Sequence, residues 1–248
     1  TKYVYIYFIH MILSDIQYFQ HFSVKNNNLI LVLSNLSQLK TINLPFSTSI
    51  LLDNKILIKN LNNSKYAEIS FKDYDLKICI IENNEYSAMK NGSFLLNNFN
   101  SLYEEEVSFV FSDILLKNND LLCSNVIFGF LLSSYSFNKY ITKKKSNFFK
   151  KVNIFLKQGI FFKGIDRLLN LLYSINFCKD LVSEPANILN PVSYALKCSS
   201  LKIKGLKVKI INLKDIKKIG MCALEAVSKG SSNEPRVVVF EWNIKKNV

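Results

Sequence analysis

The sequence of this chain predicts an α/β fold, and three observations carry that prediction. Short apolar runs that suit buried strands, such as Leu29–Leu33 and Leu76–Ile81, alternate with segments of helical apolar spacing. A longer amphipathic helix begins at Ile165, and a proline-containing joint at Asp180–Pro191 ends it. Alternating strands and helices are typical of a layered α/β domain, and the joint marks the opening of a second domain.

The elements before the joint follow from apolar runs and the breakers between them. The predicted strands are Tyr3–Leu13, Leu29–Leu33, Leu76–Ile81, Val107–Phe111 and Val152–Leu156. Helices are predicted at Lys90–Leu102 and Leu121–Tyr135, and the runs Ile50–Leu52 and Ile56–Ile58 flank a predicted turn at Asp53-Asn54. The first strand is too short to span a bilayer, which needs about 20 residues.

The joint itself is predicted from its prolines and asparagine. Pro185 cannot continue a helix, whereas Asn190 is a good N-cap and Pro191 a good first helical residue. The elements predicted after it are a helix to about Leu201, a strand Leu206–Leu213, short helices ending at Gly220 and near Gly230, and a strand Arg236–Trp242 that we expect in a parallel sheet. The predicted domains are residues 1–160 and residues 161–248.

The chain is globular in composition but strongly basic. It has 32 Lys and Arg against 19 Asp and Glu, a formal net charge of +13, which raises the question of nucleic acid or an anionic membrane as partner. Only Arg167 and Arg236 are arginines, the residue type that reads guanine and clamps phosphate with two bonds. We interpret most of the charge as a solvated lysine surface and keep weak nucleic-acid contact as the lesser alternative.

The cysteine and histidine content limits which disulfide, metal and catalytic sites the chain can form. The five cysteines are odd in number and form no C-x-x-C, which predicts reduced thiols in place of a disulfide framework or zinc knuckle. The two histidines, His10 and His21, lie near the start, so a histidine-based triad in the second half is excluded. The sequence has no G-x-G-x-x-G, P-loop or G-x-S-x-G motif.

Three stretches, in this order, carry a family resemblance: Gly129–Lys145 (GFLLSSYSFNKYITKKK), Asp180–Pro191 (DLVSEPANILNP) and Ile216–Trp242 (IKKIGMCALEAVSKGSSNEPRVVVFEW), the last of which ends in a predicted strand. Together they resemble the cytosol (leucyl) aminopeptidase family. The matching positions are Gly129, Leu132, Ser134, Tyr135, Phe137, Tyr140, Thr142, Lys143, Asp180, Leu181, Glu184, Pro185, Ala186, Asn187, Pro191, Gly220, Met221, Ala223, Val227, Gly230 and Ser231. The departures are Ser183 for the usual Asn, Cys222 and Ser228 for a common Gly, and Glu225 for an apolar residue.

The resemblance implies an architecture and an activity. Residues 1–160 would form an N-terminal macro-like α/β domain, and residues 161–248 the linking helix and the start of an α/β metallopeptidase catalytic domain. The implied protein is a cytoplasmic aminopeptidase that releases N-terminal residues, with leucine-type preference, from peptides in intracellular protein turnover. It would use two divalent metal ions, manganese or zinc, and assemble as a homo-hexamer, without membrane association.

The same resemblance assigns no catalytic, cofactor-binding or metal-ligating residue to these positions. It places the ligands in motifs that do not occur before Val248, so we expect residues 1–248 to be inactive by themselves and to bind no metal. The consecutive carboxylates Glu104–Glu106 diverge and do not converge on one ion. Glu184 and Glu241 match the family frame, but the resemblance gives them no metal role.

A second class of function stays open. The chain would then be a stand-alone α/β binding or scaffold module, either an eroded gene product or a macro-like nucleotide or DNA binder. With only 7 glycines, the sequence shows no loop that would cradle a phosphate. The codons beyond Val248 separate the two hypotheses, because a continuing V-G-K-G-x-T-F-D frame supports the enzyme.

Overall fold

The computed structural model describes residues 16–19, 28–42, 44, 48–71, 74–98, 106–142, 151–155 and 164–242. Its contacts divide the chain into two compact units, Thr1–Phe177 and Cys178–Val248, and each is described by itself. Strands and helices alternate along the chain, so the predicted α/β class is confirmed. Helix α7 (Ile165–Ser183) contributes to both units, and the domain boundary predicted at residue 160 stays a prediction.

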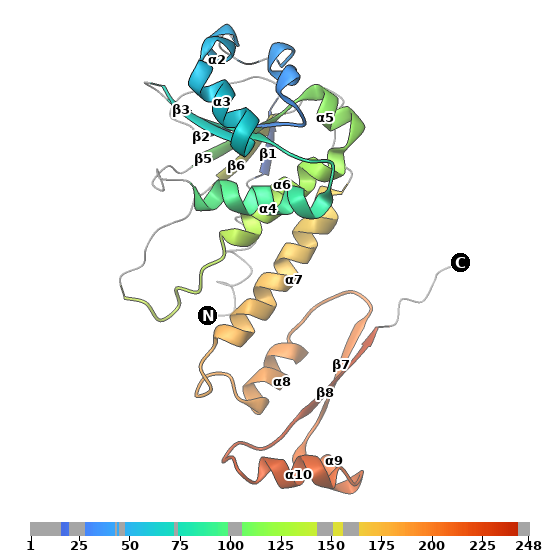
Figure 1. Ribbon diagram of the computed structural model, residues 1–248. Helices are drawn as coiled ribbons and strands as arrows, with labels where there is room; N and C mark the ends of the chain where they lie inside the picture. The colour runs from blue at the N-terminus through green and yellow to red at the C-terminus, as the bar shows by residue number, and fades with distance from the viewer. Residues whose placement is uncertain are drawn as a thin grey trace, which may run out of the picture. The chain divides into compact units, whose positions relative to one another are not determined.

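Within the described residues, unit 1 is built on a six-stranded sheet in the order β1-β6-β5-β2-β4-β3 (Figure 1). The strands are β1 (Ile16–Phe19), β2 (Asn28–Leu33), β3 (Tyr66–Ser70), β4 (Asp75–Ile80), β5 (Glu106–Phe111) and β6 (Lys151–Phe155). Neighbouring strands are parallel, except that β3 pairs antiparallel with β4. The central strand β2 lies between β4 and β5, so the chain leaves it toward one side and later returns to the other.

Helices cover both faces of this sheet, which explains why its central strands read as unbroken apolar runs (Figure 1). Leu29, Leu31 and Leu33 of β2 face the core that includes the 3-10 helix η1, α2 and α3. Ile30 and Val32 face the opposite core, with α4, α5, α6 and α7. The bounds of these helices are η1 (Leu36–Lys40), α2 (Ser49–Asp53), α3 (Lys55–Ser64), α4 (Glu85–Asn97), α5 (Asp113–Asn118) and α6 (Asp120–Ser133).

Helices α4 and α6 touch at two glycines. A Cβ atom added at Gly92 would lie 2.0 Å from the carbonyl oxygen of Val126, and one added at Gly129 would lie 1.9 Å from that of Met89. These neighbours are backbone atoms of the opposite helix, so the two glycines allow a closer approach than any other residue permits. Gly129, which opens the first stretch of the family resemblance, is therefore required by the packing of unit 1.

Before the joint, the structure moves the start of one predicted helix and assigns the two apolar runs for which the sequence predicted only an intervening turn. Ile50–Leu52 and Ile56–Ile58 are helical, because Asn54 ends α2 and caps α3 by accepting a hydrogen bond from the Leu57 N–H at 3.0 Å. Helix α4 begins at Glu85, five residues before the predicted start, because Asn84 caps it through the Ser87 N–H. The predicted strand Tyr3–Leu13 lies outside the described residues.

Unit 2 combines the end of α7 with a two-stranded ribbon and three helices, counted over the described residues. Its elements are α8 (Pro191–Ser199), β7 (Leu206–Ile211), α9 (Leu213–Lys218), α10 (Cys222–Ser228) and β8 (Val237–Trp242). The ribbon is antiparallel and not parallel as expected, because α9 and α10 reverse the chain between its strands. Among its described residues, the buried hydrophobic side chains are Ala195, Cys198 and Ile216. No helix in the described part of the whole chain is long and apolar enough to cross a membrane.

All five cysteines are free, as their odd number predicted, and they differ in exposure. Cys79 and Cys123 are buried, and burial raises the pKa of Cys79 to about 12 and that of Cys123 in the same direction. Only the thiolate attacks an alkylating reagent. We therefore expect iodoacetamide at pH 8 to label the exposed Cys178 and Cys222 in the native protein, and all five thiols after denaturation. Peptide mass spectrometry measures both, and native labelling of Cys79 would contradict the expectation.

Candidate functional site

The joint Asp180–Pro191 ends in a capping box at Asn190, which begins helix α8. The Asn190 side-chain oxygen accepts hydrogen bonds from the N–H groups of Val192 (3.1 Å) and Ser193 (3.0 Å). The Ser193 hydroxyl in turn accepts one from the Asn190 N–H at 2.9 Å, and Pro191 occupies the first turn. The predicted N-cap and first helical residue are thus confirmed, and α8 begins at a fixed position.

Glu184, at the centre of this joint, has a completely buried side chain. Its carboxylate lies 3.6 Å from the ammonium group of Lys197 on α8. A buried carboxylate is costly unless an opposite charge and hydrogen bonds accompany it. Because its carboxylate is paired with the Lys197 ammonium group, Glu184 suits the anchoring of the joint to α8.

In the third stretch of the family resemblance, Gly220 ends helix α9. Its φ of +78° lies in the left-handed region, and two hydrogen bonds close the end of α9. The Gly220 N–H donates to the Lys217 carbonyl and the Met221 N–H to the Ile216 carbonyl, each at 3.1 Å. This pattern is a Schellman motif, so the predicted left-handed cap is confirmed.

Glu225, which replaces the family's apolar residue, is partly exposed and paired with Lys217 at 3.3 Å. It is therefore a surface position of unit 2 and not a core position. The exposed pair contributes little to stability, because solvent screens charges of this kind.

Within the described residues, the candidate metal ligands weighed from the sequence form no metal site. Glu104 and Glu105 lie outside the described residues, Glu106 opens β5, and Glu241 lies on β8 opposite Lys207. In the described ranges, no group of three or more His, Cys, Asp or Glu side chains could hold a metal ion. These residues do not fit the metal pair that the resemblance implies, so no catalytic step is assigned through a metal here.

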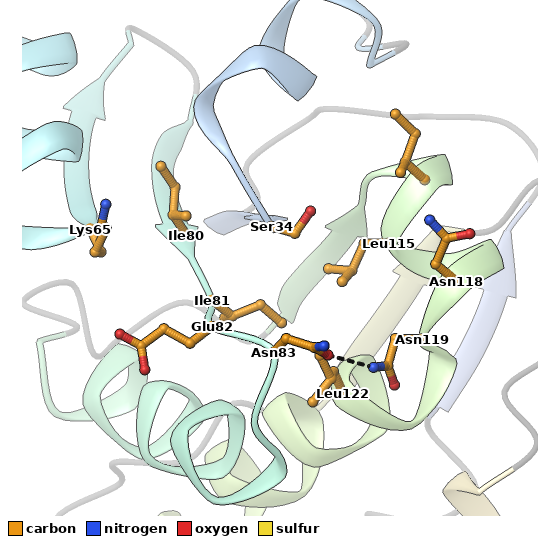
Figure 2. A pocket seen from close by; sticks show the side chains of 11 residues that line it. Ser34, Lys65, Ile80, Ile81, Glu82, Asn83, Leu115, Asn118, Asn119 and Leu122 are labelled. Carbon is orange, nitrogen blue, oxygen red and sulfur yellow. Dashed lines mark hydrogen bonds between the residues drawn. The ribbon is translucent and has the colours of Figure 1, made fainter.

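A different candidate site lies in unit 1, where β2, β4 and the helix after β5 meet at the carboxyl ends of the strands (Figure 2). A cavity of about 430 Å³ opens there, and its apolar lining consists of Ile80, Ile81, Ile114, Leu115 and Leu122, all of them buried except Ile114. Its polar lining consists of Ser34, Lys65, Glu82, Asn83, Asn118 and Asn119. The point beyond the carboxyl ends where the strand order reverses is the usual ligand position in open α/β sheets.

One wall of this cavity is held by the buried side chain of Gln38. Its carbonyl oxygen accepts hydrogen bonds from the Ser34 N–H (2.9 Å) and from the Ser112 hydroxyl (2.7 Å). Its amide nitrogen donates to the Ser34 hydroxyl at 2.6 Å. Gln38 thereby ties the end of β2 to the end of β5 and fixes Ser34 beside the cavity.

Two asparagines link the opposite parts of the cavity. The amide nitrogen of Asn119 donates to the side-chain oxygen of Asn83 at 2.8 Å, which joins the β4–α4 connection to the α5–α6 joint (Figure 2). None of these residues was predicted from the sequence to belong to a binding site. The available signal was the polar residue that follows each apolar strand run, namely Ser34 after β2, Glu82 after β4 and Ser112 after β5.

Comparison with solved structures identifies the fold. A mutant of tomato leucine aminopeptidase aligns with a TM-score of 0.69 at 15% identity, over 94% of this chain and 52% of its own. The bottromycin maturation enzyme in complex with Mn aligns with a TM-score of 0.63 at 12% identity, over 89% of this chain and 46% of its own. The chain therefore has the α/β fold of the leucine aminopeptidases.

Sequence comparison gives the family. Residues 176–248 match the model described as "Cytosol aminopeptidase family, catalytic domain". A probable cytosol aminopeptidase of Phytoplasma australiense is 32% identical over 164 residues, which is 65% of this chain and 33% of that relative. One of Chelativorans sp. (strain BNC1) is 37% identical over 125 residues, which is 48% of this chain and 25% of the relative. Residues 176–248 therefore match the catalytic domain of the cytosol aminopeptidase family, and the chain spans about a quarter to a third of the length of these relatives.

Proposed function

We propose that this chain is part of a metal-dependent aminopeptidase that releases N-terminal residues, with leucine-type preference, from peptides during intracellular protein turnover. The observation that carries the proposal is the match of residues 176–248 to the catalytic-domain model of the family. The relatives named probable cytosol aminopeptidase support the same activity. The manganese in the bottromycin maturation enzyme supports the use of divalent ions.

The proposed domains, metal ions, cellular location and assembly are those that the family resemblance implies. Residues 1–160 form an N-terminal domain, and residues 161–248 form the linking helix and the beginning of the catalytic domain. Two divalent ions, manganese or zinc, bind in the complete protein to residues that this chain does not supply. The complete protein is a cytoplasmic homo-hexamer that acts on peptides.

The test compares two polypeptides in the hydrolysis of leucine amide. We expect residues 1–248 to show no turnover with added Mn²⁺ or Zn²⁺, and a polypeptide extended to the length of the relatives to show turnover that a chelator abolishes. Circular dichroism of both polypeptides confirms that each is folded. Chelator-sensitive turnover by residues 1–248 would contradict the placement of the ligands, and an inactive but folded long polypeptide would contradict the activity.

A second candidate function is a stand-alone α/β binding module. The cavity at the carboxyl ends of β2 and β4 favours it, because ligands in open α/β sheets bind at this position. An inactive long polypeptide whose unit 1 still binds a small molecule would support this alternative.

A further inference from the structure

We infer that the cavity of unit 1 binds a small zwitterion that carries an aliphatic side chain, either a free α-amino acid or a dipeptide. The inference goes beyond the proposed peptidase function and does not depend on it, because the cavity lies in unit 1 and the family match begins at residue 176. Three features carry the inference: the charges that line the cavity, a fixed hydroxyl donor, and the conformation of Lys65.

The charged residues that line the cavity lie apart from its buried apolar residues. One cation, Lys65, and one anion, Glu82, lie on the same side of the cavity, while Asn118 and Asn119 lie on the other (Figure 2). An α-amino acid carries its ammonium and carboxylate on one carbon atom, so both can face one side. Its aliphatic side chain can then cover the buried apolar part of the cavity.

Other ligand classes fit this lining less well. A phosphate ligand would face the Glu82 carboxylate, and Lys65 is the single cationic side chain among the lining residues, without an arginine. A wholly apolar ligand would remove water from the polar lining without replacing its hydrogen bonds. Opposite charges beside an aliphatic surface therefore favour a zwitterion with an apolar side chain.

Ser34 supplies a hydrogen-bond donor whose position is fixed in advance. Its hydroxyl accepts from the amide nitrogen of Gln38, and the carbonyl oxygen of Gln38 already accepts two other hydrogen bonds. The Ser34 proton is therefore directed away from Gln38 and can be donated to a ligand oxygen in the cavity that Ser34 lines. Because Gln38 is buried, this donor needs little reordering when a carboxylate binds.

Lys65 occupies a backbone conformation that favours glycine. It ends α3 with φ 60° and ψ 10°, and it is the single non-glycine residue with positive φ in the described part of the chain. A side chain in this left-handed region is disfavoured relative to glycine because its Cβ atom crowds the following carbonyl oxygen. Folding alone therefore favours glycine here, whereas the residue present is a lysine that lines the cavity.

The ligand test uses purified protein and saturation-transfer NMR with four probes. We expect leucine and the leucyl-leucine dipeptide to bind with a Kd in the millimolar range. We expect 4-methylpentanoate, which lacks the ammonium, and 3-methylbutylamine, which lacks the carboxylate, to bind about tenfold more weakly or not at all. Whichever of leucine and the dipeptide binds more tightly identifies the source of the zwitterion. Equal binding of 4-methylpentanoate, or no binding of either zwitterion, would overturn the inference.

The matched variants separate binding from folding. Lys65→Gly should keep or raise the melting temperature because it relieves the left-handed strain, yet it should weaken leucine binding about tenfold. Glu82→Gln should weaken leucine binding by a similar factor, because the ammonium group of the ligand loses its anionic partner. Lys59→Ala is the control: Lys59 is an exposed lysine of α3 that does not line the cavity, so leucine affinity should stay unchanged. Unchanged affinity in Lys65→Gly would overturn the inference, and the NMR signals report binding whether or not the protein hydrolyses peptides.

Discussion

Replacing Gly129 by alanine should lower the free energy of unfolding of unit 1 by about 4 kcal/mol or more, which is at the exceptional end for one substitution. The added methyl group would lie 1.9 Å from the carbonyl oxygen of Met89, and no side-chain rotation can relieve a contact with backbone. Helices α4 and α6 would have to separate, although both pack into the core that covers one face of the sheet. Gly92→Ala should act similarly, because its methyl group would lie 2.0 Å from the Val126 carbonyl oxygen.

Urea unfolding followed by circular dichroism measures this effect, and Gly164→Ala is its matched control. At Gly164 the nearest atom to an added Cβ is the Cδ1 atom of Leu121, at 3.0 Å, and a flexible side chain can move away. We expect the control to change the free energy of unfolding by less than about 1 kcal/mol. A Gly129→Ala protein as stable as the Gly164→Ala control would show that α4 and α6 do not cross through their glycines.

The second large effect is expected at a lysine buried within the sheet. Lys77 of β4 is 1% exposed, and its ammonium group donates to the Glu68 carboxylate of β3 at 2.8 Å. The Tyr66 hydroxyl donates to the same carboxylate at 3.1 Å, and burial followed by the Glu68 charge raises the pKa of Tyr66. Glu68→Gln should lower the free energy of unfolding by roughly 2–4 kcal/mol, because the buried ammonium loses its ion pair with the Glu68 carboxylate.

Removing the cation should have the opposite outcome. Lys77→Met keeps a similar volume and needs no counter-charge, so we expect a stability close to or above that of the parent protein. The Lys77→Met background should also make Glu68→Gln nearly neutral, and a double-mutant cycle of urea midpoints measures this coupling. A Glu68→Gln effect that persists unchanged in the Lys77→Met background would mean that the pair does not carry the stability.

The sequence predicted best where local chemistry alone decides the structure. The Asn190-Pro191 start of α8, the left-handed Gly220 and the strands β2, β4 and β5 all follow from short stretches of residues. Strand β3 was missed, because Tyr66–Ser70 is half exposed and gains its structure from pairing with β4. The two apolar runs around Asn54 were ambiguous by periodicity, and a single side-chain cap made both helical.

The candidate sites were predictable to a smaller degree. Motif spacing led to the family, because each of the three stretches is a continuous run of residues that can be read directly from the sequence. The cavity of unit 1 was not predictable in the same way, because its polar residues come from separate strand ends, the end of α3 and the α5–α6 joint. Ser34, Lys65 and Asn119 become neighbours only through the sheet order, which no local pattern encodes.

The pairing of β1 with β6 has a consequence for biosynthesis. Ile16 pairs with Val152, so the first strand of the sheet waits for a partner that is made much later in the chain. At about 5–20 residues per second on the ribosome, this delay is on the order of ten seconds. Strands β2, β4 and β5 can associate during that interval, whereas one edge of the sheet stays open until β6 emerges, which is when the nascent chain is most exposed to aggregation and most in need of a chaperone.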